Sequence, residues 1–371
     1  MKRSPFFPDY ASHKPTLVGI QGWEVPNLFT SPQREHEAVR TAVGLLDWST
    51  TGEFEIQGPD ALEVVQRLIV NDAASMPVGR VLYTTMLGEA GNILSDITVY
   101  RLGPEHYMLM TAWGSNAANE RPEYALLLEQ SRGRNAIVYD RSSGIGLLAL
   151  QGPRSRALLK ELTGADLDHL EYMWALPAEV AGIRALISRT GYTGELGYEI
   201  LVPAEHAHDF WTAVTGAGAA HGLEPVGMVA AFSLRMEKGY IMRFDFAGGR
   251  TPYEIGLGWT VKLDKGEFVG REALARRKAA GFQDKLVMMA IDDGHVPASG
   301  ETILKDGTAV GKTTSAAFGY TVGKALSLGY VPLSLATPGV AVEIQDGQGQ
   351  VHPAVVSRRS MYDPEGARLR G

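Results

Sequence analysis

Along the first third of the chain, the spacing of apolar and polar residues switches between the period of a helix and that of a strand. From Ser31 to Leu46, apolar and small residues fall at helical spacing behind the cap Ser31-Pro32, which predicts a helix. Glu53 to Gln57 alternates as a strand, and Asp60 is placed to cap a helix that runs through Leu68. Three further strands are predicted, over 81–87, 93–102 and 106–111. This order indicates an α+β unit with an antiparallel sheet.

The middle of the chain repeats that order. A strand over Ile145 to Gln151 ends in Gly152-Pro153, and a helix follows from Ser155 to Leu162. Gln57-Gly58-Pro59 stands at the same kind of junction, so an internal duplication is a hypothesis, although three matching residues support it weakly. Further elements are predicted as strands over 185–188 and 198–202 and helices over 204–216 and 226–238.

Beyond Ala280 the pattern changes to short strands interrupted by Gly, Asp-Gly and Pro. This texture is typical of an all-β domain, a small barrel or sandwich. The segment Arg271 to Ala280 is rich in Arg, Lys and Ala and predicts a connecting helix.

Composition narrows the class of protein. The 371 residues are 45% hydrophobic and 21% charged, which predicts a globular protein of two or three domains. A formal net charge of -7 argues against nucleic acid as a partner, and zero cysteines exclude disulfides, thiolate nucleophiles and iron-sulfur clusters. Neither a signal peptide nor a membrane-spanning apolar run is evident, so we expect a cytoplasmic protein without a membrane partner.

The loop from Arg189 to Glu199 holds three glycines within seven residues, together with Tyr192 and Glu195. Glycines let a ligand approach the backbone closely. A carboxylate there could accept two parallel hydrogen bonds from an amino-pyrimidine edge, and tyrosine rings could stack on a flat ligand. The alternative, slightly favoured on pattern alone, is an ordinary hairpin with a solvated Glu195.

A second candidate is Asp96, which begins a β-forming run directly after the turn Gly91-Asn92. A carboxylate at a strand start can act as a proton acceptor or stabilise a cation. On spacing alone, an ordinary turn-edge aspartate is the better interpretation. No metal site is expected, because His206 and His208 point to different faces of a predicted helix and lack a third ligand.

A third segment, Leu234 to Gly239, closes the helix predicted from Val226. We interpret it as structural, with Arg235 in a buried ion pair with a glutamate and Gly239 as the helix C-cap.

Taken in order, these segments resemble the aminomethyltransferase (T-protein) family of the glycine cleavage system. They also resemble the related tetrahydrofolate-binding part of dimethylglycine and sarcosine oxidising enzymes. The resemblance covers nearly the whole chain, and its anchors include Gly58 to Ala61, Gly91 to Asp96, Arg189 to Glu195, Leu234 to Gly239 and Gly256 to Trp259.

The resemblance implies an α+β fold of three domains in a cloverleaf around a central folate channel, with a C-terminal all-β barrel. The expected domains are 1–50 with 140–260, 51–139, and 261–371 including the connector. Tetrahydrofolate is the implied cofactor. Asp96 matches the catalytic acid that helps to place and protonate the reacting centre. Other matches are Glu195, which holds the pterin edge, and the pocket residues Tyr83, Tyr172 and Tyr192.

Two departures from the glycine-cleavage pattern affect the expected donor. Ser95-Asp96 replaces an Asp-Asp pair, and Ala230-Ala231-Phe232 replaces an Ala-Arg-Asp run whose Arg would grip the folate tail. The segments 236–239 and 263–274 and the tail Tyr362-Asp363-Pro364 instead resemble the oxidase-linked and demethylase relatives.

We therefore expect a tetrahydrofolate-dependent methyl or methylene transferase, or demethylase, that acts on a small methylated amine. It would work alone or receive its one-carbon unit from a separate oxidising subunit. One alternative is a true aminomethyltransferase acting on a lipoyl carrier protein. A non-catalytic folate-binding regulatory protein ranks last, because such proteins carry a cysteine beside the Gly-Tyr motif and this chain has none.

Overall fold

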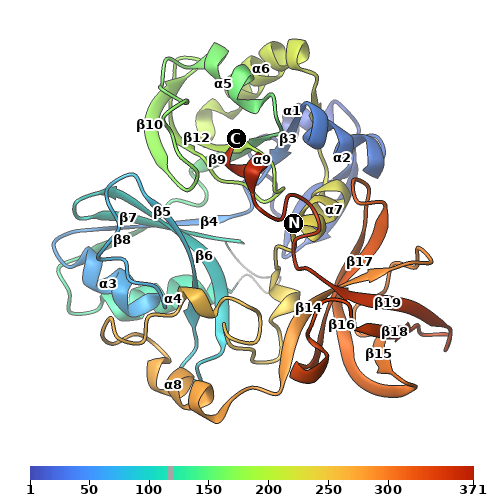
Figure 1. Cartoon of the computed structure of the whole chain (residues 1–371). Helices are drawn as coiled ribbons and strands as arrows, with labels where there is room; N and C mark the ends of the chain where they lie inside the picture. The colour runs from blue at the N-terminus through green and yellow to red at the C-terminus, as the bar shows by residue number, and fades with distance from the viewer. Residues whose placement is uncertain (113, 115–119) are drawn as a thin grey trace.

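Three lobes, each built on its own sheet, meet at the centre of the molecule (Figure 1). The computed structural model describes residues 1–112, 114 and 120–371. Within those ranges, no helix combines the length and the apolar character needed to cross a membrane. The mixed lobes and the terminal barrel confirm the predicted α+β class.

The first lobe contains a six-stranded sheet in the order β10-β11-β12-β9-β3-β13. Its strands are β3 (Val43–Asp47), β9 (Ile145–Gln151), β10 (Ala175–Val180), β11 (Ile183–Ser188), β12 (Gly197–Pro203) and β13 (Leu223–Pro225). Associated with it are α1 (Phe7–Ala11), α2 (Pro32–Thr41), α5 (Ser155–Leu162), α6 (Ala207–Gly218), α7 (Met228–Lys238) and the hairpin β1 (Thr16–Ile20) and β2 (Trp23–Leu28). Leu158 of α5 and Phe210 of α6 pack on Leu148 and Ile200, which gives this lobe its own core.

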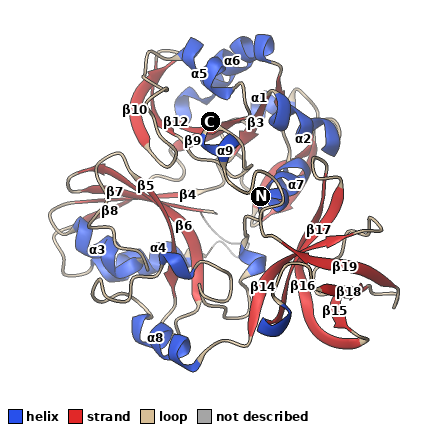
Figure 2. Cartoon of the chain, viewed as in Figure 1, coloured by secondary structure: helices blue, strands red, loops and turns tan. Residues whose placement is uncertain are grey.

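The second lobe is a five-stranded sheet in the order β5-β6-β7-β4-β8. Its elements are β4 (Gly52–Gln57), β5 (Val81–Leu87), β6 (Ile93–Gly103), β7 (His106–Thr111), β8 (Ile137–Asp140), α3 (Ala61–Leu68) and α4 (Pro122–Ser131). Figure 2 shows α3 and α4 on the same side of this sheet. On the opposite face, Tyr100 and Met108 pack against Leu147 and Leu201 of the first lobe, so that face points inward.

The third lobe is a closed barrel in the order β14-β17-β16-β15-β18-β19, which confirms the predicted all-β domain. Its strands are β14 (Asp284–Ile291), β15 (Thr302–Lys305), β16 (Thr308–Gly319), β17 (Lys324–Pro332), β18 (Ala341–Gln345) and β19 (Val351–Ser357). The predicted connector is α8 (Arg271–Ala280). After β19 the chain returns towards the first lobe and ends in the short α9 (Ala367–Arg370).

One apolar cluster joins the three lobes. It contains Leu87 from β5, Met236 from α7, Ile255 and Leu274 from the segment before the barrel, and Leu328 from β17. All five side chains are buried. Since burial of one such side chain contributes about 1.5–3 kcal/mol, the lobes share a substantial part of their stabilisation.

The helix predicted over Ser31 to Leu46 is wrong in its second part. Ser31 does cap α2, because its Oγ accepts a hydrogen bond from the Arg34 backbone N–H at 3.2 Å, but the helix ends at Thr41. Residues 43–47 form β3, a buried strand between β9 and β13. Periodicity could not separate the two possibilities, since a short apolar run fits a buried strand as well as a helix.

The repeated Gln-Gly-Pro segments mark the same turn in both lobes. Gly58 and Gly152 have φ values of 133° and 137°, and a Cβ would lie 2.5 Å from the Asn135 oxygen and 2.4 Å from the Ala42 oxygen. Only glycine tolerates both conditions. The predicted cap at Asp60 is wrong, because its carboxyl accepts a hydrogen bond from the Asn135 backbone rather than from α3.

Candidate functional site

Asp96 lies on the inward face of the second lobe. It is on β6, directly opposite Thr85 of β5. Tyr83 lies two residues before Thr85 in β5 and on the same face of the sheet. The Tyr83 hydroxyl donates a hydrogen bond to Asp96 Oδ2 at 2.9 Å. Among the described residues, no side chain donates to Oδ1. This oxygen is therefore available to a ligand.

Burial changes the acid–base behaviour of this pair. It raises the pKa of Asp96 to about 6, against the lowering effect of the Tyr83 hydrogen bond, and the charges of Asp245 and Glu123 raise it further. Burial and the neighbouring Asp96 also raise the pKa of Tyr83 well above its usual value. At neutral pH, Asp96 is thus an ionised acceptor close to its titration point, held by a protonated phenol.

A row of tyrosines lies beside this pair. The rings of Tyr192 and Tyr240 are stacked, with centroids 5.7 Å apart and an angle of 19° between the planes. Tyr172 hydrogen-bonds with Tyr240, and Tyr192 donates to the Ile241 carbonyl oxygen at 2.5 Å. The structure thus brings the predicted Tyr172 and Tyr192 together through Tyr240, which the sequence analysis missed. Its only signal was its place directly after the motif that ends at Gly239.

Glu195 is buried, so the alternative of a solvated hairpin residue is wrong. Its Oε1 accepts a hydrogen bond from the Tyr362 hydroxyl and lies 3.5 Å from Arg40 Nη1. No described residue donates to Oε2. Glu195 was expected to accept two parallel hydrogen bonds from a ligand, one on each carboxylate oxygen. Because Oε1 already accepts from Tyr362, the structure leaves Oε2 as the open acceptor.

Arg235 is fully buried, and its ion-pair partner differs from the predicted glutamate. Its Nη1 lies 3.1 Å from Asp245 Oδ2 and donates to the Tyr240 carbonyl oxygen at 2.9 Å. Glu237 instead pairs with Arg40 at 2.9 Å. The Nε and Nη2 of Arg235 have no acceptor among the residues that the structure describes. Buried donors of this kind usually have a partner, so they suit an oxygen atom of a ligand.

Phe232 comes directly after the buried Ala231, and it is Ala231 that stands where the related pattern has an arginine for the folate tail. The Phe232 ring packs against a small apolar cluster of Trp23, Val25 and Met228, and the Arg235 guanidinium carbon lies 5.4 Å from the ring centroid. Both positions are therefore apolar and offer no charge.

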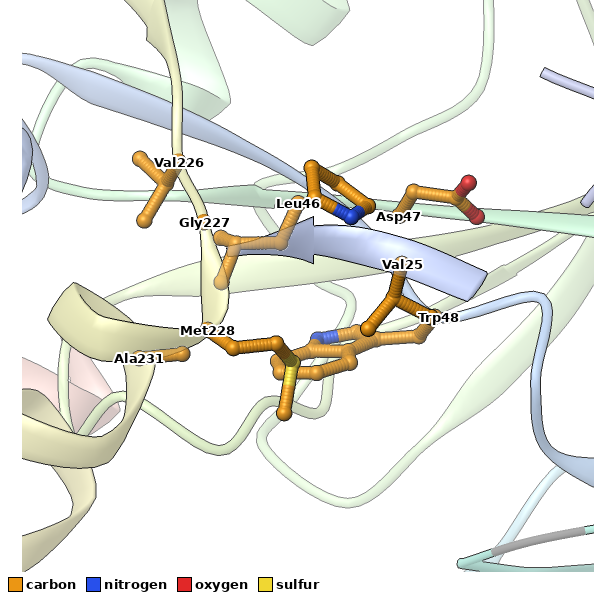
Figure 3. Close-up of a pocket in the computed structure, with 9 residues that line it drawn as sticks. Val25, Leu46, Asp47, Trp48, Val226, Gly227, Met228 and Ala231 are labelled. Carbon is orange, nitrogen blue, oxygen red and sulfur yellow. The ribbon is translucent and has the colours of Figure 1, made fainter. Parts of the chain in front are cut away.

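Two cavities lie outside the Asp96–Tyr83 pair, and the first borders the tyrosine row, because its Trp48 ring meets the Tyr192 ring edge-on with the centroids 6.5 Å apart. This first cavity, of about 10 Å³, is lined by Leu46, Asp47, Trp48 and Met228 among others, and Figure 3 shows the Asp47 carboxyl pointing away from the Trp48 ring. This volume is that of about one water molecule. The other, of about 280 Å³, lies between the start of β14 and the end of α8. The candidate site is therefore defined by the polar groups around Asp96 and not by a cavity.

Comparisons with known proteins cover almost the whole chain. Residues 7–265 match the model of the GCVT N-terminal domain, and residues 285–363 match that of the glycine cleavage T-protein C-terminal barrel domain.

Two relatives with the same name, aminomethyltransferase, match over nearly their full length. An aminomethyltransferase of Halothermothrix orenii is 38% identical over 93% of this chain and 95% of the relative. One of Symbiobacterium thermophilum is 40% identical over 93% of each chain. The crystal structure of the glycine cleavage system aminomethyltransferase T from Bartonella henselae superposes with a TM-score of 0.89, at 26% identity and 98% coverage of both chains.

Proposed function

The chain belongs to the glycine cleavage T-protein family of tetrahydrofolate-dependent aminomethyltransferases, and from this we propose that it transfers a one-carbon unit from an aminomethylated lipoyl carrier protein to tetrahydrofolate. The names of its relatives and their full-length similarity support this donor better than the small methylated amine that the sequence patterns favoured. The chain is accordingly a transferase.

The open polar groups of the site fit tetrahydrofolate. Glu195 Oε2 can accept an N–H from a pterin edge, and the tyrosine row can stack on the flat ring. The unpartnered donors of Arg235 suit a carbonyl or carboxylate oxygen of the same ligand. We propose Tyr83, Asp96, Tyr172, Tyr192 and Glu195 as its binding residues.

When bound, tetrahydrofolate supplies the nitrogen atoms that accept the carbon. Asp96 contributes an ionised carboxylate above about pH 6, which can take a proton from a reacting amine or stabilise its positive charge. Tyr83 fixes the orientation of that carboxylate through its hydrogen bond. Because the pair is largely withdrawn from solvent, its interaction with a developing charge is stronger than it would be in water.

The observation that carries the proposal is the partly buried, hydrogen-bonded Asp96–Tyr83 pair beside the tyrosine row. Anaerobic titration with tetrahydrofolate tests it. Glu195→Gln removes the charge from the proposed pterin contact and should weaken binding by about 1.5–3 kcal/mol, roughly tenfold to hundredfold.

The exposed Glu205 provides a matched control, and Glu205→Gln should bind like the wild type. Absence of saturable binding by the wild-type protein would exclude the proposed function. Equal affinity of the two Gln variants would remove Glu195 from the binding residues.

A second candidate keeps the small methylated amine as donor, alone or with a separate oxidising subunit. Ala231 and Phe232 favour it, because Ala231 stands in place of the arginine that the glycine-cleavage pattern carries and both positions are apolar. Mass spectrometry of folate products separates the two candidates. Product formed with an aminomethylated lipoyl carrier supports the first, and product formed only with methylated amines supports the second.

A further inference from the structure

The tail after β19 is fixed to the first lobe. The backbone N–H groups of Met361 and Tyr362 donate to the Glu237 carbonyl oxygen at 2.8 and 3.0 Å. Lys238 Nζ lies 3.1 Å from Asp363 Oδ2, and both side chains are buried. Further on, Arg189 donates to the Arg370 carbonyl oxygen. The tail is thus a strap from the barrel to α7 and the loop that carries Glu195, and Figure 1 shows α9 next to β9.

The strap delivers one side chain to the proposed folate site. The Tyr362 hydroxyl donates to Glu195 Oε1, and the Arg40 guanidinium carbon lies 3.8 Å from the centroid of the Tyr362 ring. Arg40 therefore contacts both the phenol ring and the carboxylate. It is itself fixed, because it donates to the Thr193 carbonyl oxygen and to Glu237 Oε2, both at 2.9 Å.

We propose that Tyr362 and Arg40 are positioning residues that hold Glu195 in one orientation, with Oε1 occupied and Oε2 presented to a single N–H donor of the ligand. This inference rests on the proposed function, in which Glu195 binds the pterin. It follows that the barrel supplies, through its tail, a residue that completes a site in the first lobe.

The same contacts influence the charge of Glu195. Burial raises its pKa, whereas the Tyr362 hydrogen bond and the Arg40 charge oppose that rise. From the tail, Arg368 also lowers the pKa and Asp363 raises it. Because the Tyr362 hydrogen bond lowers this pKa, loss of the Tyr362 hydroxyl should raise the pKa of Glu195 further.

Tyr362→Phe tests the inference through tetrahydrofolate affinity measured from mildly acidic to mildly basic pH. If the ligand needs an ionised Glu195, the variant should lose affinity increasingly as the pH falls. The loss should reach about tenfold at the acidic end, the effect of one hydrogen bond to a charged group. Asp96 titrates in both proteins, so the difference between their profiles reports on Glu195.

Two further variants make the result decisive. Tyr139→Phe removes a hydroxyl from β8 and should leave the profile unchanged. In the Glu195→Gln background, Tyr362→Phe should cause no additional pH-dependent loss, because the titrating partner is gone.

The outcomes separate this inference from the proposed function. A loss of affinity that is the same at every pH indicates a merely structural tail and overturns the inference, as does a Tyr362→Phe variant that binds like the wild type while Glu195→Gln binds weakly. If the wild-type protein binds no tetrahydrofolate, the proposed function fails, and the inference fails with it.

Discussion

Asp96 illustrates how one buried side chain ties stability to chemistry. Its ionised form is disfavoured by burial, so the folded protein binds this proton more tightly than the unfolded chain does. Stability linked to this group is therefore fully present below the unfolded pKa, near 4, and is lost as the pH rises through about 6. At neutral pH the protein keeps a destabilising charge at its proposed reacting centre.

Asp96→Asn should accordingly stabilise the protein and inactivate it. At neutral pH we expect a gain in the free energy of unfolding of roughly 2–3 kcal/mol, and transfer activity should fall by about 10²–10⁴-fold. The gain should vanish below about pH 3, where wild-type Asp96 is largely protonated in both states. Urea unfolding at the two pH values measures this, with Asp264→Asn as an exposed control. A variant that is less stable at neutral pH contradicts the proposed cause.

The residues of the candidate site could be predicted from the sequence only in part. Asp96 and Glu195 stand in motifs whose order along the chain resembles a known family, and the structure buries Glu195 fully and Asp96 in part. Tyr362 stands in a tail segment that also resembles relatives, but neither that segment nor the one around Arg40 indicates a contact with Glu195. Tyr362 and Arg40 reach Glu195 from positions 167 and 155 residues away, and no local spacing encodes contacts of that range.

At the scale of elements, α7 ends at a residue that must be glycine for two reasons, its backbone conformation and the lack of space for a side chain. Gly239 is the predicted C-cap and adopts a left-handed φ of 73°. An added Cβ would lie 2.2 Å from the Arg359 carbonyl oxygen, at the start of the tail. Helix end and tail are thus packed against each other with no room between them.

Gly239→Ala should therefore destabilise the protein more than a positive φ alone explains. Gly222, which ends the short helical turn over 219–221 with a φ of 71° and a ψ of 35°, shares this left-handed conformation, and its added Cβ would meet no atom closer than 3.4 Å, so it serves as the control. Gly222→Ala should cost about 1 kcal/mol, and Gly239→Ala at least about 1 kcal/mol more. Chemical unfolding of both variants measures the two free energies of unfolding. Equal losses of stability would show that the contact with Arg359 adds nothing to the cost.

Strand and helix identities followed from local pattern where the pattern was distinctive. β5, β6 and β7 alternate and are separated by turn residues, and they lie where the sequence predicts them. β3 was mistaken for the end of a helix because its run of apolar residues carries no period. Only its pairing with β9 and β13 makes it a strand.

At the scale of the whole molecule, the shared apolar cluster bears on how the lobes unfold. We propose the units 1–50 with 140–260, 51–139 and 261–371 as the domains, since each large sheet falls within one of them. The cluster around Ile255 nevertheless takes side chains from all three. We infer that they unfold together.

Ile255→Ala tests this coupling. The side chain is fully buried, so its truncation should lower the free energy of unfolding by about 2–5 kcal/mol within a single transition. Val351→Ala, at a residue that is 42% exposed, should have little effect. Calorimetry together with tryptophan fluorescence checks that one transition is shared. Two separate transitions would show that the lobes are independent.

Local sequence is enough to specify the α+β class, an all-β domain after the connector and the helix caps at Ser31 and Gly239, and the resemblance to a known family adds the two carboxylates of interest. These depend on spacing, turn residues and ordered motifs, which are written along the chain. Tertiary structure alone decided that β3 is a strand, that Arg235 pairs with Asp245, and that Glu195 offers one open oxygen. Each of these depends on which distant segments pack together, because burial and hydrogen-bond partners exist only once the three lobes have met.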